Sequence, residues 1–238
     1  RDEFVGMKVF DRKKGKEVLW APHNANGYFT GDSMTLRAAF AQSVNSIAVK
    51  LGQQVGISNV VETAHQMGIL SPLEENPSLA LGSSDVNLLE MVNGYSTVAA
   101  DGKVQAPILI TRIVDRNGKV IFDEKNLPAP VQGISYRSAF FMQELLKSGL
   151  REPGGTSMAL WSYIREFDRT TDFGGKTGTS NNHSDAWYIG ITPGLVGGAW
   201  VGGEYRCIHF RTGALGQGSR TALPIWGFFI QDVLKDNR

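Results

Sequence analysis

The eight residues Phe173–Ser180 read FGGKTGTS, and the rest of the chain is interpreted outward from them. Two apolar runs follow at once, at residues 185–193 (DAWYIGITP) and 194–202 (GLVGGAWVG). Short runs rich in aromatic and β-branched residues, joined by a Pro-Gly pair, predict neighbouring antiparallel strands with a tight turn. Lys176–Thr179 is therefore expected to form the strand before them. Gly178 leaves that strand without a side chain where another backbone or a ligand could approach.

A phosphate-binding loop and a purely structural hairpin are two other interpretations of this stretch. The phosphate-binding motif needs Gly-x-x-x-x-Gly-Lys-Thr at the start of a helix, and Thr170 stands where the first glycine is required. Gly178 and the polar residues 180–184 also disfavour a helix after the lysine. A glycine-rich hairpin without chemistry would be the default for this stretch alone, and the residues upstream argue against it.

The composition indicates one large globular domain spanning residues 1–238. Its hydrophobic content of 42% is enough for a sizeable core. Lys and Arg number 24 against 23 for Asp and Glu, a net charge of +1, so no basic stripe indicates nucleic-acid binding. One cysteine excludes an internal disulfide, and four scattered histidines lack metal-ligand spacing, so no metal site is expected. No apolar run is long enough to span a membrane.

The remaining chain is predicted to be mainly helical, with two hairpins within residues 4–20 and 108–123. Four serines before apolar-periodic runs are expected as helix N-caps: Ser33, Ser58, Ser84 and Ser135. The helices are expected at residues 34–41, 47–55, 59–67, 86–98, 136–148, 157–167 and 221–235. The fifth of these should bury a stripe made of Phe140, Phe141, Leu145 and Leu146. Residues 206–219 are expected to be a loop.

Ser43 and Asn45 lie between two of these helical segments. Serine and asparagine are poor helix-interior residues, because their side chains compete for backbone hydrogen bonds. The simpler interpretation of the pair alone is a helix cap. The alternative is a helix terminus that faces a cleft.

Ser-x-Asn at a helix junction and Lys-Thr-Gly on a strand are two of the three motifs of the active-site serine penicillin-recognising enzymes; the third is Ser-x-x-Lys. Four stretches agree, in order, with one family: residues 34–49 (MTLRAAFAQSVNSIAV), 79–84 (LALGSS) with 89–91 (LEM) after them, 175–179 (GKTGT) and 185–193. From about residue 30 to its C-terminus the chain resembles the transpeptidase domain of class A (bifunctional) penicillin-binding proteins. The resemblance implies an α/β (α+β) fold like that of the serine β-lactamases, with an antiparallel sheet flanked by helices.

The resemblance also implies a function, that of a peptidoglycan D,D-transpeptidase. Such an enzyme transfers an acyl group from a D-Ala-D-Ala stem peptide through an acyl-enzyme on a serine, and β-lactams block it. Lys176 would hold the substrate carboxylate together with the hydroxyls of Thr177 and Thr179. The backbone N–H of Thr179 would be an oxyanion donor, and Gly178 would let the substrate lie along the strand.

Two further roles follow from the same resemblance. Ser43 would relay a proton to the leaving amine, and Asn45 would bond the substrate amide. Such acyl transfer needs only side chains and backbone donors, so no cofactor and no metal are expected. The implied location is the bacterial cell envelope, on the extracytoplasmic (periplasmic) side of the inner membrane, with membrane contact only through segments outside this chain.

The third motif is missing, because no lysine of the chain has a serine three residues before it. In the family Ser-x-x-Lys precedes Ser-x-Asn, so we expect the chain to begin between these two motifs. It would then lack the N-terminal strands and the nucleophile helix and be inactive alone. The parent would carry Ser-x-x-Lys and a glycosyltransferase module upstream of Arg1. An exposed sheet edge could then support self-association. The alternatives are a serine β-lactamase and a catalytically dead penicillin-binding fold that acts as a scaffold or β-lactam sensor.

Overall fold

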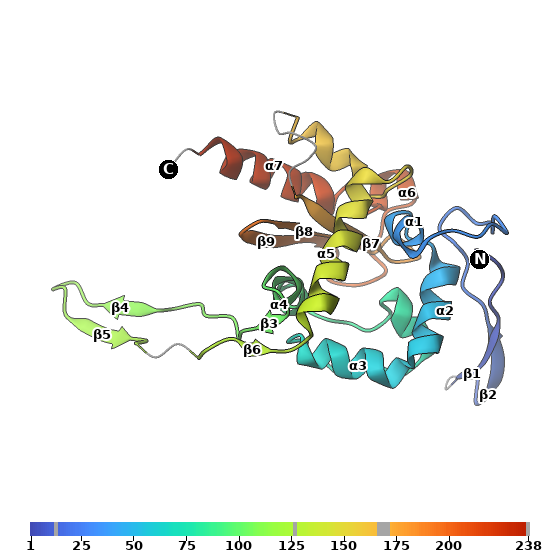
Figure 1. Ribbon diagram of the computed structural model, residues 1–238, viewed down its shortest axis with the longest axis horizontal. Helices are drawn as coiled ribbons and strands as arrows, with labels where there is room; N and C mark the ends of the chain where they lie inside the picture. The colour runs from blue at the N-terminus through green and yellow to red at the C-terminus, as the bar shows by residue number, and fades with distance from the viewer. Residues whose placement is uncertain (12–13, 126–127, 166–171, 237–238) are drawn as a thin grey trace.

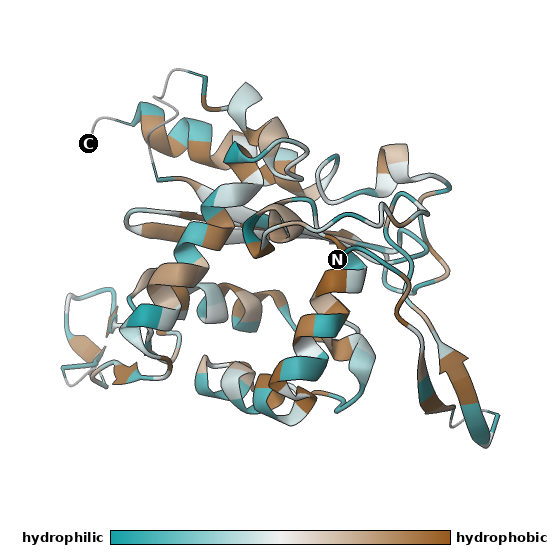
Figure 2. Ribbon diagram, turned by 45° about the vertical axis from the view of Figure 1, so that its right-hand side comes forward, coloured by the Kyte–Doolittle hydropathy of each residue, from teal (hydrophilic) through white to brown (hydrophobic). Residues whose placement is uncertain are grey.

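The computed structural model describes residues 1–11, 14–125, 128–165 and 172–236. These parts form a body of helices around a small sheet, and two hairpins extend away from that body (Figure 1). Teal and brown residues alternate along the helices in Figure 2, as expected of helices that bury one face and expose the other. Within the described ranges, no helix combines the length and the apolar character that a membrane crossing would require.

The sheet contains the opening stretch of the sequence analysis. Its strands are β7 (Gly174–Thr179), β8 (Asp185–Thr192) and β9 (Leu195–Gly202), in the order β7-β8-β9 and antiparallel throughout. The prediction of three consecutive strands, with a tight turn between the second and the third, is confirmed. Because β8 is central, β7 has one side that pairs with no other described strand.

Helices cover both faces of this sheet. Side chains on the two faces of β8 enter two different core clusters. Tyr188 packs in a cluster with side chains of α7 (Ala222–Lys235). Ile191 packs in a second cluster with side chains of α4 (Leu88–Ala99) and α5 (Tyr136–Arg151). Figure 1 shows α7 and α4 on opposite sides of β8 and β9. The sheet is thus held between two apolar layers.

A second group of helices lies beside α5. It comprises α1 (Leu36–Ala41), α2 (Asn45–Val55), α3 (Ile57–Gln66) and the 3-10 helix η1 (Pro77–Leu81). α1 packs on α5, α2 packs on α3 and η1, and α5 packs on β7. α1 and α2 thereby approach the first strand of the sheet.

The remaining elements are short, and the two hairpins among them extend away from the body (Figure 1). β1 (Met7–Asp11) pairs with β2 (Lys16–Trp20), and β4 (Arg112–Val114) pairs with β5 (Val120–Asp123), as the two predicted hairpins require. The others are β3 (Lys103–Val104), β6 (Val131–Gln132), the 3-10 helix η2 (Met158–Ser162) and α6 (Gly213–Gly216). The predicted loop at 206–219 thus contains one helical turn, and the end of the helix predicted at 157–167 lies outside the described residues.

Three of the four predicted helix caps are wrong. α1 is capped by Thr35 rather than Ser33, and α4 by Asn87 rather than Ser84, because these side chains accept the N–H three residues on. α3 starts at Ile57, directly after Gly56. Only Ser135 caps its helix as predicted.

The buried stripe of α5 also differs from the prediction. Phe140 and Phe141 are 45% and 54% exposed, whereas Leu146 is buried, with Ala139 and Leu150 above and below it. The helix continues through Gly149 to Arg151, because Gly149 lies where α5 meets β7: a Cβ there would stand 3.2 Å from the Gly175 carbonyl oxygen. The glycine therefore permits close contact with β7 and does not end the helix.

Candidate active site

The Ser43 turn joins α1 to α2 in a left-handed conformation. Ser43 has φ of 57°, which is uncommon for a residue with a side chain. Its N–H donates to the Phe40 carbonyl at 3.1 Å, which closes the end of α1, and α2 begins at Asn45. The turn is therefore a helix terminus, and it directs the Ser43 hydroxyl toward β7.

Lys176 on β7 meets that hydroxyl. Its ammonium donates to Ser43 Oγ at 2.9 Å and to the Thr177 carbonyl oxygen at 2.9 Å. Ser43 accepts this bond, so its own O–H proton remains available to a ligand. The fold thus brings together two predicted site residues that lie 133 positions apart in the sequence.

The charge of Lys176 has no counter-ion among the described residues, where no carboxylate lies within 4.0 Å of it. The Phe40 ring, 6.0 Å from the ammonium, offers only a weak cation–π contact. Burial lowers the pKa of Lys176 from 10.5 to about 8. A half-buried cation held only by neutral groups favours an anionic ligand beside it, such as a carboxylate.

The orientation of the Asn45 side-chain amide is fixed by a hydrogen bond. Its Nδ2 lies 2.7 Å from the His23 carbonyl oxygen, which can only accept, so the nitrogen must be on that side. Within the described residues nothing donates to Asn45 Oδ1, and Asn45 bonds neither Ser43 nor Lys176. Its free oxygen can accept an N–H from a ligand.

The two threonines of β7 retain capacity for a ligand. Thr177 Oγ1 lies 2.8 Å from Thr156 Oγ1, and this pair of hydroxyls uses one of its two protons, leaving one O–H free. Thr179 Oγ1 accepts the Gly218 N–H at 3.0 Å and keeps its own proton. Together with Lys176 they form a set of donors suited to an anion.

Gly178 has a packing role besides the one predicted for it. A Cβ at Gly178 would stand 3.1 Å from the Cβ of Trp187 on β8, closer than ordinary van der Waals contact. The unpaired side of β7 could accept an extended ligand as an added strand. The packing against Trp187 is therefore a second reason for a glycine at this position.

Sequence reasoning missed three residues of this site: Thr156, His23 and Gly218. Thr156 also links β7 to α1, because its N–H donates to the Ala41 carbonyl at 3.0 Å. His23 and Gly218 contribute only backbone groups. A backbone group carries no side-chain signal, so no sequence pattern could have identified these two.

A sequence model of the family described as "Penicillin binding protein transpeptidase domain" matches residues 6–196. Penicillin-binding protein 2D of Bacillus subtilis (strain 168) is 34% identical over 222 residues, which cover 92% of this chain and 31% of that protein. Penicillin-binding protein 1A of Aquifex aeolicus (strain VF5) is 34% identical over 226 residues, covering 95% and 29%. The chain thus spans about a third of the length of these curated relatives.

Solved structures agree with the sequence comparison. The crystal structure of penicillin-binding protein 1A from Haemophilus influenzae matches with a TM-score of 0.83 and 27% identity, covering 100% of this chain and 39% of that one. PonA1 from Mycobacterium tuberculosis in complex with penicillin V matches with a TM-score of 0.72 and 24% identity, covering 97% and 62%. The second likeness supports the fold alone, and the predicted α+β fold is confirmed. The chain belongs to the penicillin-binding protein transpeptidase domain family and resembles the class A members of that family, as the motifs predicted.

Proposed function

We propose that this chain is the substrate-binding part of a peptidoglycan D,D-transpeptidase domain, which cross-links stem peptides that end in D-Ala-D-Ala and is blocked by β-lactams. The observation that carries the proposal is the hydrogen bond between Lys176 Nζ and Ser43 Oγ. It joins the Lys-Thr-Gly strand to the Ser-x-Asn turn, and the cation it holds lies on the same strand as two threonine hydroxyl groups that can donate to a ligand.

In this proposal the strand binds the acyl donor. Lys176 attracts the terminal carboxylate, and the Thr177–Thr156 pair and Thr179 donate hydroxyl hydrogen bonds to it. The substrate backbone lies along the unpaired side of β7, where the absent side chain of Gly178 gives it room. The Thr179 N–H is the oxyanion donor that residues 1–238 supply.

The Ser43 turn then supplies a proton to the leaving group. When a serine attacks the penultimate D-Ala carbonyl, its hydroxyl proton passes to a base that accompanies that serine, and the bond to the terminal D-Ala nitrogen breaks. That nitrogen must gain a proton. Ser43 gives its hydroxyl proton and receives one from Lys176 across 2.9 Å. The pKa of Lys176, about 8, suits a donor that works near neutral pH. Asn45 Oδ1 accepts the substrate amide N–H.

The attacking serine is proposed to come from polypeptide outside residues 1–238, because these residues contain no Ser-x-x-Lys. In that arrangement residues 1–238 form one incomplete domain that is inactive alone. The relatives named above are bacterial proteins, and the proposed location is the extracytoplasmic side of the inner membrane, with stem peptides as the partner and membrane contact through other segments.

A fluorescent penicillin tests this function. It is added to the 238-residue chain and to a polypeptide extended by about a hundred residues upstream, a length typical of half a domain or more. We expect covalent labelling of the longer form only. Labelling of the shorter chain would identify a nucleophile within it and contradict the assignment of roles.

The absence of Ser-x-x-Lys is also the one observation that favours the alternative, a catalytically dead penicillin-binding fold acting as a scaffold or β-lactam sensor. If the longer polypeptide folds but is not labelled, this alternative replaces the transpeptidase.

A further part of the proposal is self-association of the isolated chain through β9. β9 is an outer strand of the described sheet, and it exposes Trp200 on its surface. An unpaired strand edge beside an aromatic side chain is a template for pairing with a second copy. We expect sedimentation velocity to show dimers that increase with concentration and decrease when Trp200, whose N–H faces the open edge, is replaced by proline. A monomer at every concentration would exclude this contact.

A further inference from the structure

The carboxylate of Asp2 is the centre of a buried hydrogen-bond network in the N-terminal segment, and this network is called the hub below. Asp2 is only 2% exposed, yet it accepts four hydrogen bonds. Oδ1 accepts from Asn24 Nδ2 at 2.7 Å and from Ser46 Oγ at 2.7 Å, and Oδ2 accepts from the N–H and the hydroxyl of Thr30 at 2.9 and 3.1 Å. The hub thus joins the loop at residues 23–32 to the first turn of α2.

The same network encloses Asn45. Asn24 returns a second bond to α2, because its Oδ1 accepts the Ser46 N–H at 3.3 Å. Asn45 donates to the carbonyl of His23, the residue directly before Asn24. Asp2 therefore bonds Asn24 and Ser46, and these two residues are next in the sequence to His23 and Asn45, which bond each other.

We propose that Asp2 is a positioning residue of the active site, which fixes the loop at 23–32 against α2 so that the Asn45 amide turns its oxygen toward the acyl donor. The inference rests on the proposed function, since it assigns Asp2 to the reaction through Asn45. Without the hub, His23 would be free to move away, and Asn45 could then rotate and present its NH₂ group instead.

The chemistry of the hub requires a carboxylate. All four partners are donors, and only an ionised carboxylate accepts at both oxygens. Burial raises the pKa of Asp2, but the bonds from Thr30, Ser46 and Asn24 together outweigh burial and hold that pKa below its ordinary value. Within the described residues Asp2 forms no ion pair, so a charge is kept out of water by neutral donors alone.

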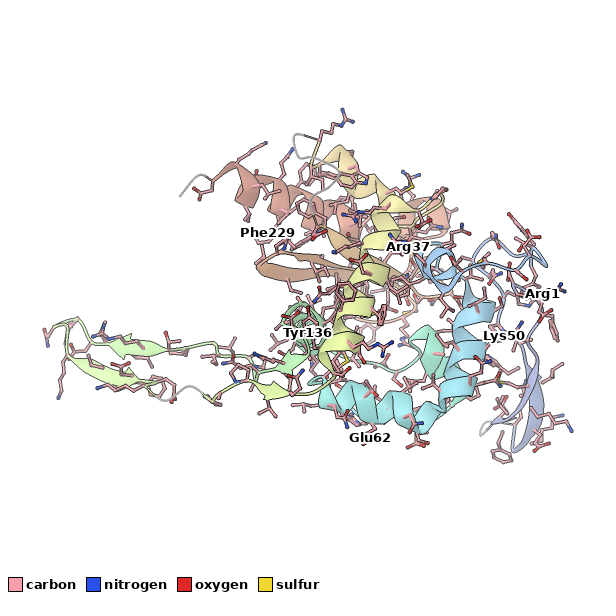
Figure 3. The ribbon with its side chains drawn as sticks, viewed as in Figure 1. Arg1, Arg37, Lys50, Glu62, Tyr136 and Phe229 are labelled. Carbon is pink, nitrogen blue, oxygen red and sulfur yellow. The ribbon has the colours of Figure 1, made fainter. Side chains whose placement is uncertain are left out.

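The neighbouring residue Glu3 offers a matched control. Glu3 pairs with Lys50 of α2 at 2.6 Å, and Lys50 also donates to the Arg1 carbonyl at 3.0 Å, so Glu3 also attaches the N-terminal segment to α2. Arg1 and Lys50 lie close together in Figure 3. Glu3 has no bond to Asn24 or Ser46, however. Attachment of the segment alone can therefore be separated from orientation of Asn45.

The experiment compares Asp2→Asn with Glu3→Gln. In the longer polypeptide that the fluorescent penicillin labels, we expect Asp2→Asn to lower the second-order acylation rate by about tenfold to a hundredfold, as small misplacements of catalytic groups do. Glu3→Gln should change that rate by less than about twofold, because an exposed ion pair contributes little. In ¹⁵N spectra of the 238-residue chain, Asp2→Asn should move the Asn45 side-chain NH₂ signals to those of a free amide.

The outcomes are distinguishable. Wild-type labelling by Asp2→Asn, unchanged Asn45 signals, or an equal loss in Glu3→Gln would each overturn the proposal. If Asp2→Asn does not fold, Ser46→Ala removes one bond to the hub and should slow acylation in the same direction. Should the wild-type protein itself resist labelling, the transpeptidase assignment fails, and the Asn45 spectra still decide whether Asp2 orients this amide.

Discussion

Replacing Lys176 with methionine should lower the rate of acylation by penicillin at least about a hundredfold in the longer polypeptide, the cost expected when a preorganised polar group is removed from a catalytic site. Methionine keeps most of the buried volume, so the effect isolates the charge. The variant loses the cation proposed to hold the ligand carboxylate, and it loses the donor that supplies Ser43 across 2.9 Å. The measurement is the second-order rate of labelling by a fluorescent penicillin.

The same substitution should make the fold slightly more stable. Burial lowers the pKa of Lys176 to about 8, whereas the unfolded chain keeps the ordinary value of 10.5. Below pH 8 both states are protonated and the folded state bears the full cost of the buried charge. We expect Lys176→Met to gain about 1–2 kcal/mol at pH 7, since the cost of the charge exceeds the two hydrogen bonds lost.

The pH dependence provides an independent measurement. Between pH 8 and 10.5 the unfolded chain binds a proton at Lys176 that the folded chain has released, so stability of the wild type rises with pH. Tyr95 and Tyr188 oppose this rise near pH 10: burial raises the pKa of both, so the unfolded chain ionises first. Urea unfolding from pH 7 to about 9.5 therefore shows the lysine alone, and the rise should be absent from Lys176→Met.

Ser43→Ala is the matched control. It removes the proposed proton relay but keeps the lysine buried, so it should slow acylation and preserve the rise in stability with pH. Labelling of Lys176→Met at the wild-type rate would contradict the proposed role of the lysine. A wild-type stability that does not change between pH 7 and 9.5 would instead contradict its buried, protonated state.

Local pattern was sufficient for the strands, but not for the residues that meet in the site. Alternating apolar runs with a Pro-Gly turn place β8 and β9, because such runs bury their side chains on the two faces of a sheet. Lys176 and Ser43 were predicted as one site through the resemblance of their motifs. Their distance could not have been derived from spacing, since it depends on how α1, α5 and β7 pack together.

The errors arose where tertiary contacts override local preference. Phe140 and Phe141 fit a helical stripe, yet the face of α5 that meets the sheet passes through Leu146, so both aromatic rings lie outside the core. α4 is capped by Asn87 and not by the predicted serine, because several neighbouring polar residues can cap a helix and packing selects among them. The Asp2 hub lay beyond local reasoning entirely, since its partners are 22 to 44 residues away in the sequence.

Replacing Trp226 with alanine should destabilise the fold by about 3–5 kcal/mol, the range for deleting a large buried aromatic side chain. Trp226 of α7 is 3% exposed and lies over Gly190 and Gly197, which pair directly across β8 and β9. A Cβ at Gly190 would stand 2.2 Å from the indole nitrogen, and one at Gly197 would stand 2.3 Å from the ring. The two glycines thus form a slot that fits this ring, and alanine would leave it empty.

Two companions make this prediction specific. Ile225→Ala, on the exposed side of the same helix, should cost less than about 1 kcal/mol by urea unfolding, because its side chain is already half in water. Gly197→Ala should cost several times more than Ile225→Ala although it adds only a methyl group, because that methyl overlaps the ring and the strand pairing prevents the backbone from yielding. An equal loss of stability in Trp226→Ala and Ile225→Ala would mean that α7 does not pack on the sheet through this slot. A tolerated Gly197→Ala would mean that the ring can move aside, and the glycine pair would then need a different explanation.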